Sequence, residues 1–225
     1  MVTARQTDDG AKWCVELPDR SERLGSSRPK AIVRLSDSED EERWVVPAAV
    51  GKSMSLFYKD CGGRIGSRAE LAYEVKRASL TAGKKRIESL LNRRDYSTKE
   101  LLNKLRDDGF SSAVSSQLVD EAVVSNLVND ARFAEVYVRS KCYAGWGKLR
   151  IERELSRKGI DARELPGWPE PYFEDGDEKA RAIELASRRR LTGKNDFQKI
   201  VRFLCGKGYS MNVSMDAARQ VLEES

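Results

Sequence analysis

The 225-residue sequence contains 41 Lys and Arg, 36 Asp and Glu and no His, so its formal net charge is +5. The absence of His excludes a Ser-His-Asp triad, a Cys-His nucleophile pair and an HExxH zinc site. With 40% hydrophobic and 34% charged residues, the composition favours helices around thin cores over one large globule. We therefore expect a helical protein that is not an enzyme and needs no metal or other cofactor.

The first 29 residues are polar, with few aliphatic side chains, a composition typical of a disordered or loosely attached tail. The sequence has no apolar run near the ~20 residues that cross a bilayer, and it does not begin with a signal-peptide segment. We therefore expect a cytoplasmic protein without a membrane partner. Four widely separated cysteines, which match neither a zinc site nor a disulfide framework, are expected to be reduced thiols: Cys14, Cys61, Cys142 and Cys205.

Residues 30–83 are expected to form an N-terminal region with short strands and a helix. Ala31–Leu35 and Arg43–Val50 are rich in β-branched residues and flank the acidic run Asp37–Glu42, a pattern that predicts two strands joined by a charged turn. Ser55–Tyr58 is a candidate third strand. Pro47 indicates that the second strand is an edge strand or ends there. The acidic run is interpreted as a solvated loop in preference to a mimic of nucleic acid.

The chain becomes helical after this region, and a short pattern then occurs three times. Arg68–Arg94 is expected to form one or two helices, with Gly83 as a break. Beyond it the pattern is an aliphatic residue, a Leu four positions later, a Gly four positions after that, and then an apolar residue. Its copies are Leu101-Leu105-Gly109-Phe110, Ile151-Leu155-Gly159-Ile160 and Ile200-Leu204-Gly208-Tyr209.

Each copy predicts the end of a helix. Two aliphatic residues one turn apart face the core, Gly ends the helix in the left-handed conformation, and the next apolar residue folds back onto the last turn. A good N-cap for another helix follows, namely Ser111, Asp161 or Ser210. The Pro-rich segment 166–171 is expected to shorten the last helix of the middle unit. The predicted fold is mainly α, with three tandem three-helix repeats (84–128, 129–173 and 174–225) in an elongated curved body.

Positive charge is concentrated in residues 129–160, which contain eight basic and four acidic residues. In the second predicted helix of this repeat, Arg150, Arg153 and Arg157 are spaced at i, i+3 and i+7 and share one face. Such a surface attracts phosphate backbones or an acidic protein groove, although a solvated basic face without a partner is equally compatible. The candidate binding residues, with the neighbouring cations and the equivalent positions of the third repeat, are Arg132, Arg139, Lys148, Arg150, Arg153, Arg157, Lys199 and Arg202.

A family resemblance rests on two strings of residues. They are Asp130-x-Arg132-Phe133-Ala134-x-x-Tyr137-Val138-Arg139 and Gly145-x-Gly147-x-x-Arg150-Ile151-x-x-Glu154-Leu155-x-x-Lys158-Gly159-Ile160. Together they resemble the signature of the RecX family, bacterial regulators of the RecA recombinase, and residues 97–110 are similar to the first repeat of that family. The resemblance extends over residues 84–225.

The resemblance implies a function. Members of the family are expected to be monomers that lie in the groove of RecA filaments on single-stranded DNA, with double-stranded DNA as a further partner. They inhibit strand exchange and the associated ATPase and coprotease activities, and so regulate DNA repair, recombination and the SOS response. The alternative is a stand-alone helical-repeat protein that binds nucleic acid through the basic face alone. The modest net charge of +5 favours the first hypothesis.

Overall fold

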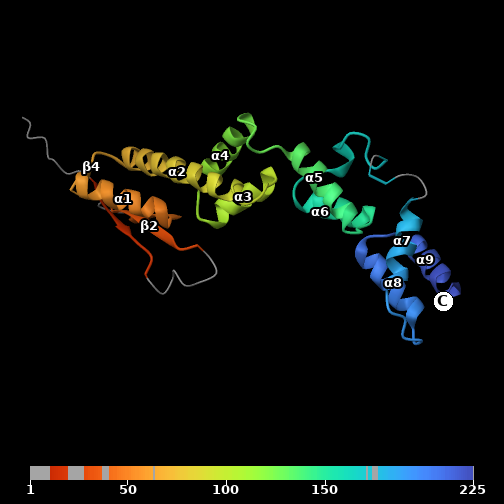
Figure 1. The fold of residues 1–225 in the computed structure, drawn as a ribbon. Helices are drawn as coiled ribbons and strands as arrows, with labels where there is room; N and C mark the ends of the chain where they lie inside the picture. Colours follow the sequence, from red (N-terminus) through yellow and green to blue (C-terminus); the bar gives the residue numbers. More distant parts are fainter. Residues whose placement is uncertain are drawn as a thin grey trace, which may run out of the picture. The chain divides into compact units, whose positions relative to one another are not determined.

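The computed structural model describes residues 11–19, 28–36, 41–62, 64–170, 172–173 and 177–224. It divides into two compact units, the first containing residues 1–96 and 100–128 and the second residues 97–99 and 129–225. Helices predominate in both units, and a small antiparallel sheet lies at the N-terminal end of the first (Figure 1). The prediction of a mainly α protein with a β-containing N-terminal region is therefore confirmed.

The sheet of the first unit has the strand order β3-β2-β1-β4. Its strands are β1 (Ala11–Glu16), β2 (Lys30–Ser36), β3 (Glu41–Pro47) and β4 (Arg64–Ile65). As predicted, β3 is an edge strand that ends at Pro47. The assignment of residues 1–29 to a loose tail is wrong at β1, because Trp13 is buried opposite Leu35 of β2 and gives this segment an apolar anchor. Residues 1–10 and 20–27, and the acidic positions 37–40, lie outside the described part.

Helix α1 (Ala48–Asp60) covers one face of the sheet (Figure 1). The expectation of a third strand at Ser55–Tyr58 is wrong, because these residues form the second half of α1. Val50, Met54 and Phe57 recur at helical spacing and pack into the core of the first unit, so burial of this stripe outweighs the strand preference of the aromatic residues.

Helix α2 (Arg68–Leu91) passes through Gly83 without a break. Gly83 is buried, and a Cβ added there would lie 2.2 Å from Cδ1 of Leu118 in α4 (Ser112–Val124). Gly83 therefore permits close packing of two helices and does not end one. The first helical repeat and the sheet share one core, which extends from Trp13 to Val128, so the division placed before residue 84 falls inside α2.

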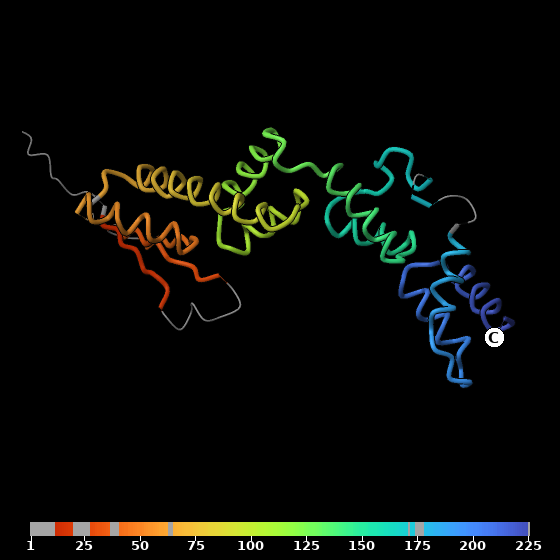
Figure 2. Tube along the Cα trace, viewed as in Figure 1, coloured from red at the N-terminus to blue at the C-terminus, as the bar shows by residue number. Residues whose placement is uncertain are grey.

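The remaining helices follow in chain order. They are α3 (Thr98–Asp107), α5 (Asp130–Tyr143), α6 (Lys148–Arg157), the 3-10 helix η2 (Ala162–Glu164), α7 (Asp177–Ser187), α8 (Asp196–Lys207) and α9 (Met211–Glu223). In the second unit, α5, α6 and η2 enclose one core, and α7, α8 and α9 enclose another (Figure 2). The third helix of the middle repeat is shortened, as predicted.

The repeated glycine pattern forms the same helix end in each repeat. Gly109, Gly159 and Gly208 have φ angles of 98°, 84° and 98°, in the left-handed region. In each copy the amide of the next residue donates to the carbonyl of the Leu five positions earlier, at 3.1, 3.0 and 3.1 Å. The residue after that caps the next element, because Ser111, Asp161 and Ser210 each accept a hydrogen bond from an amide of its first turn. The prediction of this motif is confirmed.

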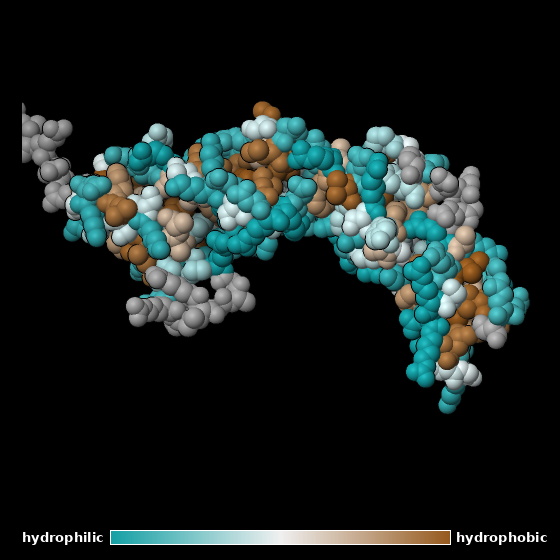
Figure 3. Space-filling view, in the orientation of Figure 1, coloured by the Kyte–Doolittle hydropathy of each residue, from teal (hydrophilic) through white to brown (hydrophobic). Residues whose placement is uncertain are grey.

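The surface is mostly hydrophilic, with apolar patches between the charged side chains (Figure 3). One patch lies over the end of α4, where Val123, Val124 and Leu127 are exposed. Across the described ranges, none of the helices is long and apolar enough to cross a membrane.

Candidate functional site

The central helix of the candidate site is α6. Its apolar residues Ile151 and Leu155 are completely buried, whereas Arg153 and Arg157 are exposed. Arg157 forms an ion pair with Glu154, with 2.7 Å between Nη1 and Oε1. Arg153 has no ion-pair or hydrogen-bond partner within the described residues. Helix α6 is therefore amphipathic, as predicted, with its aliphatic residues in the core and Arg153 and Arg157 on the solvent-exposed face.

Arg150 differs from the prediction of an exposed stripe. It is half-buried, its Nη1 donates to the carbonyl oxygen of Gly206 at 3.0 Å, and its guanidinium lies 3.8 Å from the ring centroid of Trp146. The physical reason is that the start of α6 packs against the end of α8. The amide of Gly147 donates to the carbonyl of Lys207 at 2.9 Å, and the amide of Leu149 to that of Gly208 at 3.2 Å. Arg150 thus holds α6 and α8 together.

This junction joins the two helices that carry the predicted cations. Arg202 and Lys199 are exposed on α8, and Gly206 lies one turn after Arg202 on the same exposed face. The Arg150–Gly206 hydrogen bond therefore joins α6, which also carries Arg153 and Arg157, to the turn of α8 that follows Arg202. We call these residues the basic strip: Arg150, Arg153, Arg157, Lys199 and Arg202.

The cations of the basic strip differ in whether they have partners within the described part of the protein. Lys199 donates from Nζ to Oγ1 of Thr192 at 2.5 Å and lies 3.4 Å from Asp196. Burial raises the pKa of Asp196, but hydrogen bonds from Thr192 and from the amide of Gly193 outweigh it and hold the pKa below its ordinary value. Arg202, like Arg153, has no ion-pair or hydrogen-bond partner in the part of the chain that the structure describes. These two guanidinium groups are the ones most available to an anionic partner.

The remaining sequence-predicted candidates lie elsewhere on the second unit. Arg132 and Arg139 are on the exposed face of α5, which is turned away from the core shared with α6, and Arg139 pairs with Glu135 at 2.8 Å. Two apolar side chains share this face, Val136 at 58% and Tyr143 at 98% exposure. Lys148 is half-buried at the start of α6. Arg132 and Arg139 therefore belong to a mixed surface distinct from the basic strip.

A group of aromatic rings, not predicted from the sequence, lies beside cations in the second unit. Lys141 Nζ is 5.2 Å from the ring centroid of Tyr137 and 5.0 Å from that of Trp146. Lys158 Nζ is 5.2 Å from Tyr137 and 5.5 Å from Phe133. Tyr137 and Trp146 are both only partly buried. The alternation of cations and aromatics between residues 133 and 158 was the signal for this arrangement, which suits stacking on nucleic-acid bases.

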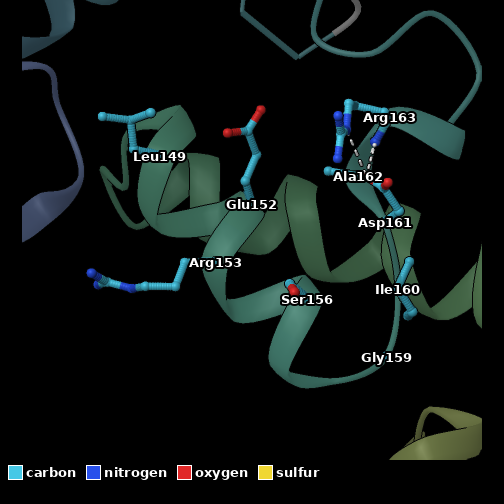
Figure 4. Close-up of a pocket in the computed structure, with 9 residues that line it drawn as sticks. All are labelled: Leu149, Glu152, Arg153, Ser156, Gly159, Ile160, Asp161, Ala162 and Arg163. Carbon is cyan, nitrogen blue, oxygen red and sulfur yellow. Dashed lines mark hydrogen bonds and ion pairs between the residues drawn. The ribbon is translucent and has the colours of Figure 1, made fainter.

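An open hollow of about 700 Å³ lies between α6 and η2 (Figure 4). The Arg153 side chain extends away from the pair formed by Asp161 and Arg163 on the opposite side. The amide and the guanidinium of Arg163 both donate to Asp161 and hold the pKa of its carboxyl below the ordinary value. The lining carries two carboxylates, Glu152 and Asp161, against two guanidinium groups, Arg153 and Arg163, so the hollow itself has no surplus of positive charge.

A family model described as RecX, second three-helix domain, matches residues 129–164. The "Regulatory protein RecX" of Legionella pneumophila (strain Corby) is 31% identical over 137 residues, which cover 59% of this chain and 89% of that protein. The protein of the same name from Mycobacterium sp. (strain KMS) is 35% identical over 137 residues, covering 56% of this chain and 74% of the relative. The chain belongs to the RecX family.

Solved RecX structures have the same fold. A crystal structure of RecX from Lactobacillus salivarius is 24% identical and aligns with 65% of this chain and 96% of its own, with a TM-score of 0.50. A second crystal structure, of regulatory protein RecX, is 18% identical and aligns with 90% of this chain and 96% of its own, with a TM-score of 0.54. The RecX model matches α5, α6 and η2, and thus the α6 part of the basic strip, whereas Lys199 and Arg202 lie outside that match.

Proposed function

We propose that this RecX-family protein regulates the RecA recombinase by binding the RecA filament that forms on single-stranded DNA. In this proposal it acts in the bacterial cytoplasm, has no catalytic activity of its own, and binds as a monomer in the groove of the filament. The proposal is supported by membership of the family of regulatory proteins and by the basic strip. The observation that carries it is the Arg150–Gly206 hydrogen bond, because it fixes α6, the helix of Arg153 and Arg157, to α8, the helix of Lys199 and Arg202.

The basic strip is suited to an extended anionic partner. Among the described residues Arg153 and Arg202 have no ion pair to break on binding, and the exposed pair of Arg157 with Glu154 stabilises the fold by only ~0–1 kcal/mol, so it is easily exchanged. DNA phosphates or acidic residues along a filament groove supply successive negative charges for such a strip. A protein bound in this way would hinder growth of the filament and lower strand exchange, ATP hydrolysis and coprotease activity during DNA repair, recombination and the SOS response.

Trp146 and Tyr137 are the proposed base-contacting residues. Each ring is partly exposed and lies within about 5 Å of Lys141, so a base stacked on the ring also has a cation near its phosphate. Stacking of one base on an aromatic side chain contributes roughly 1–3 kcal/mol and depends little on base identity. Such contacts would add affinity for single-stranded DNA without sequence preference, which a regulator of a filament on arbitrary DNA requires.

The test is ATP hydrolysis by the cognate RecA on single-stranded DNA, titrated with substoichiometric amounts of this protein. The variant Arg153→Ala/Arg202→Ala removes the two unpartnered cations of the strip. The matched control Lys52→Ala/Lys76→Ala removes the same charge from exposed positions of α1 and α2 in the first unit. We expect wild type and control to inhibit alike, and the strip variant to need a concentration roughly tenfold or more higher, since each lost phosphate contact weakens binding and its salt dependence.

Two outcomes would contradict the proposal. Equal inhibition by wild type and the strip variant would show that the basic strip does not contact the filament. If wild type leaves ATP hydrolysis unchanged but binds bare single-stranded DNA in a salt-sensitive way, the stand-alone nucleic-acid-binding hypothesis replaces it. Circular dichroism of each variant separates loss of binding from loss of helical structure.

A further inference from the structure

A second concentration of positive charge lies in the first unit, in a hollow of about 290 Å³. The hollow is formed by the start of α1, the middle of α2 and the residues that follow α3. Its lining includes Arg28, Ala49, Lys85, Arg86 and Asp108. It was not singled out from the sequence, because these residues are up to 80 positions apart.

The start of α1 supplies a hydrogen-bond donor to this hollow. Its N-cap is Pro47, which has no side-chain acceptor, and its first turn contains no acidic residue. The amide of Ala48 donates to the carbonyl of Pro29 at 3.2 Å. Ala49 lines the hollow, and its amide has no acceptor among the described residues. A free amide and the helix dipole together favour an anion at this position.

Arg86 is the second and independent observation. Its side chain is only 11% exposed, and its Nε donates to Oδ2 of Asp108 at 2.5 Å. Its Nη1 is buried and has no acceptor within the described residues. A buried guanidinium nitrogen without an acceptor is rare in native proteins and indicates a missing ligand oxygen or water. The unsatisfied donors of Arg86 and of α1 therefore border the same hollow.

The charge of the hollow indicates which ligand it fits. Arg28, Lys85 and Arg86 contribute three positive charges, and Asp108 is the one carboxylate among the described lining residues. Asp108 is already engaged, because Arg28 Nε lies 3.5 Å from its Oδ1 while Arg86 occupies Oδ2. The surplus of two positive charges matches a phosphate dianion better than a single carboxylate.

We propose that this hollow is a binding site for a phosphate group, held by the amide of Ala49, by Arg86 at its base and by Arg28 and Lys85 at its rim. The site is independent of RecA binding and lies outside the basic strip of the second unit. Its ligand is the phosphate chemistry itself, carried by inorganic phosphate, by a nucleotide or by the 5′ end of a DNA strand.

The experiment is a titration of the full chain with sodium phosphate, followed by the ¹H–¹⁵N NMR shifts of Ala49, Val50 and the Arg86 Nε–H. Sodium chloride at equal ionic strength is the reference. The variant Arg28→Gln/Lys85→Gln removes the two exposed cations and keeps the buried Arg86–Asp108 pair, so it is expected to fold. We expect saturable shifts in wild type and an affinity weaker by about fivefold for each charge removed. Lys76→Gln, on the same helix but outside the hollow, is the matched control and should bind as wild type does.

A second variant tests the position of the anion. In Ala49→Glu the new carboxylate reaches the hollow from the first turn of α1 and takes the place of the ligand. We expect phosphate titration to be lost while Tm in phosphate-free buffer rises, whereas a variant that merely disrupts the fold would show a lower Tm.

Further arms identify the source of the phosphate. If a 5′-phosphorylated oligonucleotide shifts these amides more strongly than its 5′-hydroxyl counterpart, the ligand is the end of a DNA strand. If only a nucleotide or inorganic phosphate shifts them, the ligand is a small molecule. Either result supports the site. The proposal is overturned if phosphate causes no more shift than chloride, if Lys76→Gln weakens binding as much as Arg28→Gln/Lys85→Gln, or if only an acidic peptide shifts these amides.

Discussion

The contact between α6 and α8 gives a sharp test of how the basic strip is assembled. Gly147 has an ordinary φ of −81°, so the backbone itself accepts alanine at this position. A Cβ added there would lie 2.5 Å from the carbonyl oxygen of Gly208, 2.6 Å from its carbonyl carbon and 2.7 Å from the amide nitrogen of Tyr209. All three are backbone atoms, which cannot rotate out of the way. We predict that Gly147→Ala separates α6 from α8.

The magnitude follows from the contacts that the separation removes. Carbon atoms pack at about 3.5–4.0 Å, so the helices must move apart by about 1 Å. The two backbone hydrogen bonds of the junction, from Gly147 and from Leu149, are then lost at about 1 kcal/mol each. Alanine is also a poorer N-cap than glycine, which adds roughly 0.5–1 kcal/mol. The total is about 2–3 kcal/mol, or roughly 10–20 °C in Tm for a unit of this size.

The assay is thermal and urea unfolding of the full chain, with Gly206→Ala as the matched control. Gly206 lies near the end of α8, and an added Cβ there would meet no atom within 4 Å. Alanine at that position should stabilise the helix by about 0.5–1 kcal/mol. A Gly147→Ala variant that melts with wild type, or above it, would refute the close packing of α6 on α8. It would also remove the basis for one continuous basic strip.

Three further outcomes are expected. Leu155→Ala, at a completely buried position, should lower the free energy of unfolding by about 2–5 kcal/mol in urea, whereas Leu149→Ala, at 53% exposure, should change it by less than about 0.5 kcal/mol. Burial raises the pKa of Asp196, but hydrogen bonds from Thr192 outweigh it and lower the folded pKa. The resulting stabilisation is complete above the unfolded pKa of ~3.9 and is lost as pH falls through the folded pKa, so Asp196→Asn should flatten the fall of Tm on acidification below that unfolded pKa. Arg153→Ala should reduce the slope of log affinity for single-stranded DNA against log salt by about 1.

The helical repeats were predictable because their signals are local. Leu105, Gly109 and Phe110 lie within one turn and its cap, and the same chemistry acts at each copy without help from distant residues. The cations at Arg153 and Arg202 were found for a similar reason, since helical spacing alone places them opposite the buried aliphatic residues. Local interactions were therefore sufficient to predict the helices of the repeats and the exposed face of α6.

Errors arose where a distant partner decides the outcome. The strand β1 forms because Trp13 packs into a core that Leu35 and α1 complete. The sequence of residues 11–16 alone does not indicate that these distant residues are its partners. Ser55–Tyr58 is helical because Met54 and its neighbours pack against the sheet. Arg150 was assigned to the solvent because its spacing matches that of Arg153, but the carbonyl that it binds, on Gly206, is 56 residues away.

The role of Arg150 changes how the basic strip is understood. An arginine that binds a backbone carbonyl and stacks on Trp146 is fixed in the folded protein, so its neighbours on α6 and α8 keep a constant spacing before any partner arrives. Ordering flexible side chains and separate helices on binding costs free energy, and a surface that is already ordered avoids part of that cost. In the proposed function, the residues that bind, Arg153 and Arg202, are therefore different from the residue that positions them, Arg150. Loss of Arg153 should affect affinity alone, whereas loss of Arg150 should affect stability and, through spacing, affinity.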